Sequence, residues 1–175
     1  MFLIFEKTLM KKILYLFLAL ASYGISAQTT AEEYLNSAVS KFYLDNMEGA
    51  IVDYTKAIEI DPNYIEAYRK RGLAKETLKD YSGAIVDYTK AIEIDPNYAP
   101  AYRDRGIAKG KLKDHSGVIE DYTRAIEIDP NYATAYFNRG VSKFYLGDTI
   151  GACKDARKAQ ELGDDASILI KKACN

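Results

Sequence analysis

The chain has 175 residues, of which 48% are hydrophobic and 28% charged, and its formal net charge is −1. This composition is typical of a soluble folded protein, and the length fits one ordinary domain or a row of small repeated units. Basic residues are not in excess, so the chain lacks the net positive charge that is expected of a nucleic-acid-binding protein.

The first 27 residues differ in composition from the rest of the chain. A Lys-Lys pair precedes the apolar run 13–21, and small residues follow it up to Ala27. This order is typical of a secretory signal peptide, whereas a membrane span needs about 20 apolar residues. We expect a signal peptide over 1–27, with Met10 as an alternative start. The mature chain is then exported, periplasmic or secreted, and has no membrane span.

One fifteen-residue phrase is repeated along the chain. AIVDYTKAIEIDPNY occupies residues 50–64 and returns unchanged at 84–98, and VIEDYTRAIEIDPNY follows at 118–132. The spacing of 34 residues divides the mature chain into repeated units and a short tail. The predicted boundaries are 28–61, 62–95, 96–129, 130–163 and the tail 164–175.

Each unit contains two apolar stripes at helical spacing. In unit two the first stripe runs from Tyr68 through Gly72, and the second from Ala84 through Tyr88. Residues 80–83 supply turn residues between the stripes, and a proline follows the second one. The pattern predicts two amphipathic helices joined by a tight turn. We expect Gly72 and Ala84 to face each other, so that the two backbones approach closely.

These positions resemble the tetratricopeptide repeat, a 34-residue helix–turn–helix unit. The residues that carry the resemblance in unit two are Tyr68, Gly72, Ala84, Tyr88, Ala91 and Pro96. The resemblance covers residues 28–163, and it departs at the ends, where unit four has Ala156 in place of the second aromatic residue. It implies an all-α fold, a right-handed superhelical solenoid of four repeats plus a C-terminal capping helix.

The tail is expected to form the capping helix over 164–175. Ile168, Leu169 and Ala173 give it an apolar side that can cover the exposed face of unit four. Cys153 and Cys174 form an even pair in an exported chain, which favours an intramolecular disulfide that ties the cap down. Two unlinked thiols, or a bridge between two molecules, are the alternatives.

Arginine and aspartate recur at fixed positions in the units. Arg71, Arg105 and Arg139 precede the glycine position, and Asp53, Asp87, Asp121 and Asp155 precede the aromatic position of the second helix. Because an arginine near a helix interface favours a carboxylate partner, we expect a half-buried ladder of ion pairs. The alternative is a row of cationic contacts for a ligand.

The resemblance also implies a binding groove, since first-helix residues line the inner face of the superhelix in this family. The candidate groove residues are Leu35, Val39, Phe42, Tyr43, Arg69, Leu73, Thr77, Arg103, Ile107, Lys111, Phe137, Val141, Phe144 and Tyr145. Such a surface suits a peptide with apolar anchors and an acidic middle. Alternatively, the apolar members only pack the first helices together.

Other functions have little support in the sequence. The Lys–Asn–Arg clamp with which one subclass of the family binds the acidic C-terminus of chaperones is absent, because the matching places hold Leu35, Val39, Lys70, Pro100 and Asp104. His115, the single histidine, is expected to be a solvated turn residue. No catalytic, cofactor or metal-ligand motif is found.

We therefore expect a non-enzymatic scaffold that binds a protein or peptide partner, as a monomer or weak homo-oligomer. The alternative is a structural protein that self-assembles through its end faces. A small-ligand binder or an enzyme is the less favoured third class, because the sequence shows no convergent polar cluster.

Overall fold

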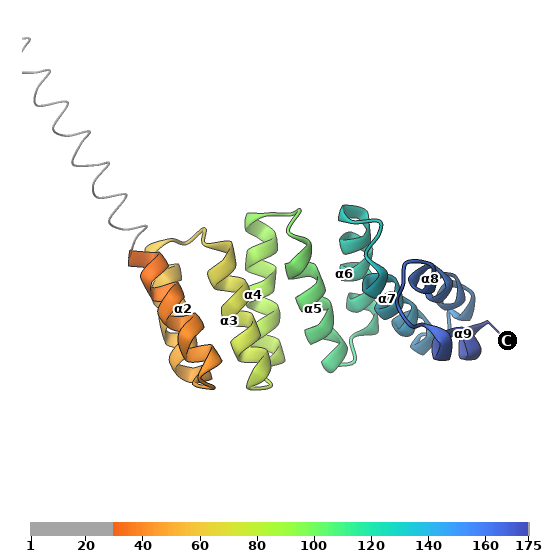
Figure 1. Ribbon diagram of the computed structural model, residues 1–175, viewed down its shortest axis with the longest axis horizontal. Helices are drawn as coiled ribbons and strands as arrows, with labels where there is room; N and C mark the ends of the chain where they lie inside the picture. Colours follow the sequence, from red (N-terminus) through yellow and green to blue (C-terminus); the bar gives the residue numbers. More distant parts are fainter. Residues whose placement is uncertain (1–29, 175) are drawn as a thin grey trace, which may run out of the picture. The chain divides into compact units, whose positions relative to one another are not determined.

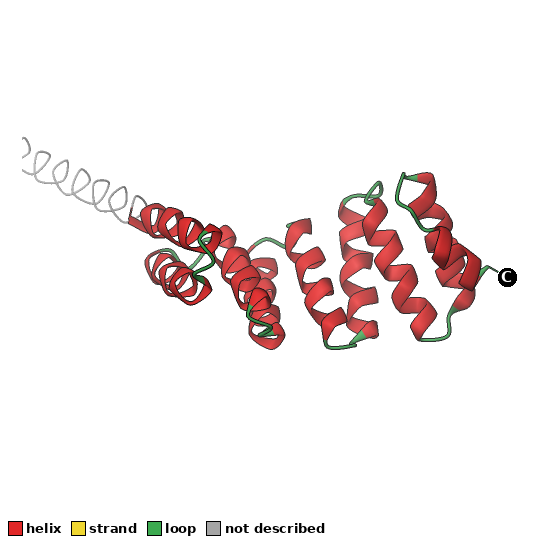
Figure 2. Cartoon of the chain, turned by 60° about the horizontal axis from the view of Figure 1, so that its bottom comes forward, coloured by secondary structure: helices red, strands yellow, loops and turns green. Residues whose placement is uncertain are grey.

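The computed structural model describes residues 30–174, which form helices and no strand (Figure 2). The chain divides into two compact parts, Met1–Ala67 and Tyr68–Asn175. The expected signal peptide lies outside the described residues. None of the described helices has the length and apolar character needed to cross a membrane.

The first part contains a helix over residues 30–43 followed by α2, Met47–Ile60. Its core is made of small residues and one aromatic side chain, since Ala38, Ala50 and Tyr54 are at most 1% exposed. Leu35 is also buried, with 6% of its surface exposed. Leu35 was predicted to line the ligand groove, but its side chain belongs to the core of the first unit and is not available to a ligand.

The second part continues the helix-pair pattern to the end of the chain. The helix α3, Ile65–Thr77, crosses the boundary between the parts. The helices that follow are α4 (Tyr81–Ile94), α5 (Ala99–Lys111), α6 (His115–Ile128), α7 (Ala133–Tyr145), α8 (Thr149–Glu161) and α9 (Ser167–Ala173). Each helix from α4 to α9 packs on the next (Figure 1). The predicted all-helical fold of successive helix pairs is confirmed.

Every turn inside a pair has the same construction. Asn46, Asp80, Asp114 and Asp148 each accept a hydrogen bond from the backbone N–H three residues later and so cap the second helix. The second helix of unit two therefore begins at Tyr81, inside the segment 80–83 that the sequence assigned to the turn. The residue before each cap is left-handed, as in Lys113 with φ 63°.

The repeated Asp-Pro-Asn segment ends α2, α4 and α6 in the same way. The side chains of Asp61, Asp95 and Asp129 accept a hydrogen bond from the backbone N–H of the asparagine two residues later, at 2.9–3.0 Å. The proline between them cannot continue the helix. This local turn explains why the segment is repeated with so little change.

The glycine of the first helix faces a tyrosine ring in units two and three. A Cβ atom on Gly72 would lie 2.5 Å from Cε1 of Tyr88, and one on Gly106 would lie 3.0 Å from Cε2 of Tyr122. The nearest neighbour of Gly72 is thus Tyr88 rather than the expected Ala84. The glycine provides room for a ring that is at most 1% exposed.

The cap α9 completes unit four. Leu169 and Ala173 are buried as predicted, but Ile168 is 72% exposed, and Ile170 packs against the cluster in its place. Cδ2 of Leu169 lies 3.2 Å from the position of a Cβ on Gly140. Leu169 therefore occupies the place next to the glycine that a tyrosine takes in units two and three, where unit four has the small Ala156.

A disulfide joins the cap to the last repeat. Cys153 on α8 is bonded to Cys174, directly after α9, with a Cα–Cα distance of 5.1 Å. The bond and the packing of Leu169 hold the short α9 against α8 and α7.

Candidate functional site

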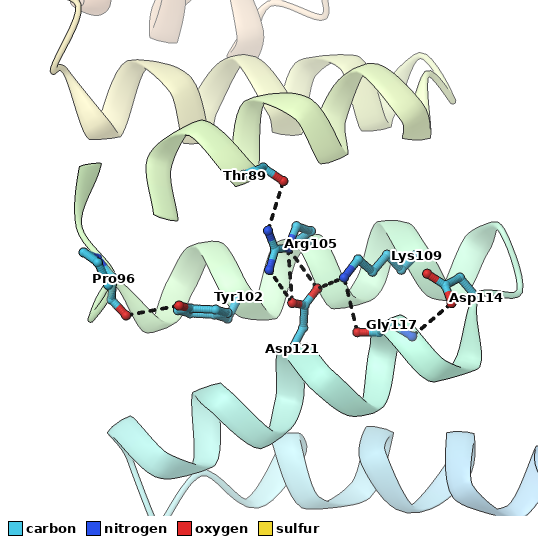
Figure 3. Close-up of polar contacts among 8 residues, drawn as sticks. All are labelled: Thr89, Pro96, Tyr102, Arg105, Lys109, Asp114, Gly117 and Asp121. Atoms are coloured by element: carbon cyan, nitrogen blue, oxygen red, sulfur yellow. Dashed lines mark hydrogen bonds and ion pairs between the residues drawn. The ribbon is translucent and has the colours of Figure 1, made fainter. Parts of the chain in front are cut away.

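The predicted ladder of ion pairs is present and lies between the two helices of each unit. In unit three, Arg105 and Lys109 both contact Asp121, at 2.6 and 3.0 Å (Figure 3). The equivalent pairs to Asp87 and Asp155 are found in units two and four. These aspartates are 1–2% exposed, so the cations compensate buried carboxylates. The ladder is structural, as the sequence favoured.

Lysine is a member of the ladder that the arginine–aspartate pattern missed. Lys41, Lys75, Lys109 and Lys143 recur every 34 residues, four positions after the arginine position, so the repeat spacing could have revealed them. In unit one Lys41 and Ser37 bind Asp53 without an arginine. Burial opposes the charge of Asp53, but these hydrogen bonds outweigh it and hold its pKa below the usual value.

The ladder also connects successive units. The guanidinium of Arg105 donates to the hydroxyl of Thr89 at 3.0 Å, and that of Arg139 donates to Thr123 at 3.2 Å. Each arginine thus binds an aspartate of its own unit and a threonine of the preceding one. This use leaves Arg105 and Arg139 engaged in packing rather than in ligand binding.

The two arginines that were predicted to line the middle of the groove share one carboxylate. Arg69 donates to Asp104 at 2.7 Å, and Arg103 donates to the other oxygen at 2.8 Å. Asp104 is 2% exposed. Burial opposes the charge of Arg69, but the attraction of Asp104 raises its pKa. Arg69 and Arg103, which were predicted to face the acidic middle of a peptide, thus have a partner within the protein.

An acidic residue lies in the same region. The hydroxyl of Tyr88 donates to Glu76 at 3.0 Å, and burial raises the pKa of Glu76 above its usual value. Glu76 is also repelled by Asp104 and attracted by Lys111. The two arginines of the middle of the groove thus already have a buried carboxylate partner, which makes them less available to an acidic ligand.

A cleft of about 710 Å³ opens farther along the chain, between α5 and α7. We call it the α5–α7 cleft. Four of the predicted groove residues line it: Ile107, Lys111, Val141 and Tyr145. Sequence reasoning missed the remaining lining residues, which are Gly106, Gly110, Lys113, His115, Val118, Tyr122, Asn138 and Ser142. Its volume is within the range of about 300–1,000 Å³ that is usual for ligand sites.

The sequence explains why the cleft opens in this unit. Gly110 occupies the position at which the other units carry Phe42, Glu76 and Phe144. The nearest neighbour of a Cβ on Gly110 would be a methyl group of Val118, at 3.7 Å. Without a side chain at 110, the space beside Ile107 and Val118 stays empty.

His115 forms one wall of the cleft. Its ring stacks on Tyr145, with centroids 4.8 Å apart and planes 13° from parallel. Its Nδ1 atom is buried and has no hydrogen-bond partner within residues 30–174. The prediction of a solvated turn residue is wrong, because Tyr145 of the neighbouring first helix reaches over the turn.

The other predicted groove residues are not among those that line the cleft. Phe137 and Phe144 pack against the core that α8 and α9 form, together with Val141 of the cleft wall, which supports the packing alternative for Phe144. Tyr43, in the first part, is 83% exposed and contacts Phe42 edge to face. Of three more first-helix residues, Val39 and Leu73 are half-buried and Thr77 is exposed.

No group of three metal-ligating side chains occurs in the described part of the chain. The polar residues around the cleft are two lysines, a histidine, an asparagine, a serine and two tyrosines. This set can form hydrogen bonds and contact anionic groups.

Comparison with known proteins agrees with the helix pairs. A family model described as "TPR repeat" matches residues 41–79 and 114–147, and one described as "Tetratricopeptide repeat" matches residues 65–98. Together these matches cover slightly more than half of the chain. A comparison with curated protein sequences finds no match.

Several solved structures share the fold. "Crystal structure of MamA protein" is 26% identical, covers 82% of this chain and 80% of its own, and has a TM-score of 0.78. "First TPR of Spaghetti (RPAP3) bound to HSP90 peptide SRMEEVD" is 26% identical, and the match covers 69% of this chain and 95% of that one, with a TM-score of 0.66. "MamA 41-end from Desulfovibrio magneticus RS-1" is 19% identical, and the match covers 83% of this chain and 89% of that one, with a TM-score of 0.74. At this identity the likeness shows the fold alone.

Proposed function

This chain is a tetratricopeptide-repeat protein, and from that premise we propose that it is an exported interaction module that binds a protein or peptide segment in the α5–α7 cleft. The repeat fold is typical of non-enzymatic interaction scaffolds, and the similar repeat of RPAP3 is described as bound to a peptide. The proposal includes a mature chain that is a monomer or weak homo-oligomer and does not bind nucleic acid.

The observation that carries this site is the cleft itself. It is hollow, has apolar walls from Ile107, Val141 and Tyr145, and has polar groups at its edges. Tyr145 is 68% exposed although it is large and aromatic. Concave apolar sites with a few placed polar groups are the usual form of a binding site.

A photo-crosslinking residue at position 107 tests the site. Ile107 is 38% exposed and lies in the cleft, whereas the control position Glu120 is exposed on α6 and does not line it. We expect cross-links to another protein from position 107 and none from position 120. Equal cross-linking from both positions would overturn the site. A product with the mass of two copies would instead favour the self-assembling alternative.

The export proposal has support from the disulfide, because disulfides persist mainly in oxidising compartments. The mass of the chain recovered from the exported fraction tests it. We expect a protein that begins at Gln28. A chain that keeps residues 1–27, or that stays inside the cell, would contradict this part of the proposal.

A further inference from the structure

We propose that the α5–α7 cleft selects a segment in which a large apolar side chain is next to an aspartate or glutamate. This inference rests on the proposed function and adds the chemistry of the partner. Its grounds are the room beside Gly110 and the charge of the groups at the edge of the cleft.

The apolar part of the ligand follows from the shape of the site. Gly110 stands at the repeat position where units one and four carry Phe42 and Phe144, so the cleft lacks the ring that those units have there. Its walls near Gly110 are the side chains of Ile107, Val118 and Val141. A phenylalanine, leucine or similar side chain of a partner would restore the contacts that the glycine leaves unmade, and would bury apolar surface on both molecules.

The acidic part follows from the charges. Lys111, Lys113 and His115 line the cleft, and none of the residues given above as its lining is acidic. Lys111 and Lys113 are exposed, so their ammonium groups can reach a bound segment.

The acidic groups near this edge leave those lysines accessible. The Asp114 carboxylate accepts from the Gly117 N–H at 2.9 Å and so caps α6. Glu76 on α3 attracts Lys111, but no ion pair within residues 30–174 joins Lys111 or Lys113 to a carboxylate. The next lysine in the helix, Lys109, is held by Asp121 and is not part of this edge. An anionic residue of a partner is therefore complementary to the two lysines.

The same contacts argue against an acidic ligand elsewhere on the first helices. Arg69 and Arg103 both pair with the buried carboxylate of Asp104, so their donors are already engaged. Selection for acid should then depend on Lys111 and Lys113. Because both lysines are exposed, we expect charge to contribute selectivity and the apolar side chain to contribute most of the affinity.

A random dodecapeptide library displayed on phage, selected on the purified protein, tests the inference. We expect selected peptides to carry Asp or Glu next to Phe, Tyr, Leu or Ile. The variant K111E/K113E should weaken the binding of a selected peptide, measured by fluorescence anisotropy, by roughly tenfold. Its matched control, K79E/K154E, reverses two exposed lysines outside the cleft and should leave the affinity unchanged.

A second variant separates the two proposals. G110F fills the cleft from within a helix and meets only an ordinary contact at Val118, so it should fold and abolish binding. E120F adds the same ring to α6 outside the cleft and is its control. This inference is overturned if the selected peptides lose binding to G110F but lack acidic residues, or if they bind K111E/K113E as well as the wild type. Either result leaves the proposed function standing. If no selected peptide is sensitive to G110F, both fail.

Discussion

Alanine in place of Gly72 and of Gly110 makes the same change inside two first helices, with opposite expected results. Both glycines lie in the interior or last turn of a helix, at φ values open to any residue. Replacing a helix-interior glycine by alanine favours the helix by about 1 kcal/mol. Gly110→Ala meets only a methyl group at 3.7 Å, so this gain should appear almost in full as added stability.

Gly72→Ala should lose more than it gains. Its Cβ would lie 2.5 Å from the ring of Tyr88. The ring is fully buried, and its hydroxyl donates to Glu76 at 3.0 Å, so it has little freedom to move away. Overpacking of this kind costs about 1–3 kcal/mol. We therefore expect a net loss of up to about 2 kcal/mol. Gly106→Leu should likewise lose about 1–3 kcal/mol against Tyr122.

Urea unfolding followed by circular dichroism measures these differences. Gly110→Ala and Gly72→Ala should differ by about 1–3 kcal/mol, and their melting temperatures by several degrees, since 1 kcal/mol corresponds to about 2–4 °C at this size. Equal stabilisation by the two alanines would refute the argument. It would mean that the Tyr88 ring can move and that the glycine is not required for close packing.

Three further predictions concern the cap, the buried tyrosine and the shared carboxylate. Cys174→Ala should cost about 3 kcal/mol and speed hydrogen exchange in α9 before other helices, because the bond closes a loop of 21 residues; unchanged exchange in α9 would contradict this. Burial, with a smaller effect of Glu66, raises the pKa of Tyr54 from 10.0 to about 12. The contribution of Tyr54 to the free energy of unfolding is therefore complete below pH 10 and should fall as the pH rises towards 12. Tyr54→Phe should reduce the slope of the free energy of unfolding in urea against pH, and an unchanged slope would refute this assignment. Reversing Arg69 and Arg103 to glutamate should cost about 3–5 kcal/mol by leaving the buried Asp104 without cations, and a variant with wild-type stability would show that the carboxylate is not buried as described.

The role of the repeated arginines and aspartates could be predicted from sequence because both partners recur with the period of the fold. Arg105 and Asp121 are 16 residues apart in a unit whose two helices must pack together. The same reasoning would have found Lys109, one helical turn after the arginine. A contact within one helix pair depends on a short stretch of chain, so both of its residues recur with the repeat and can be recognised in the sequence.

The groove was harder to predict because its members belong to different units. Arg69 and Asp104 are 35 residues apart, and their pairing depends on the register of neighbouring first helices. The stacking of His115 on Tyr145 has the same origin. Position in the repeat identifies which residues lie on first helices, but it does not tell which of them already have partners.

The sequence by itself determined the helical repeat, its turns and the presence of a cap, because these follow from spacings of 3.6 and 34 residues and from capping side chains near their helices. Only the tertiary structure decided that Asp104 pairs with two arginines, that Leu169 occupies the place next to Gly140, and that the space beside Gly110 stays open. The physical reason is that pairing and empty volume depend on side chains from several helices at once, and a local pattern in the sequence does not contain that information.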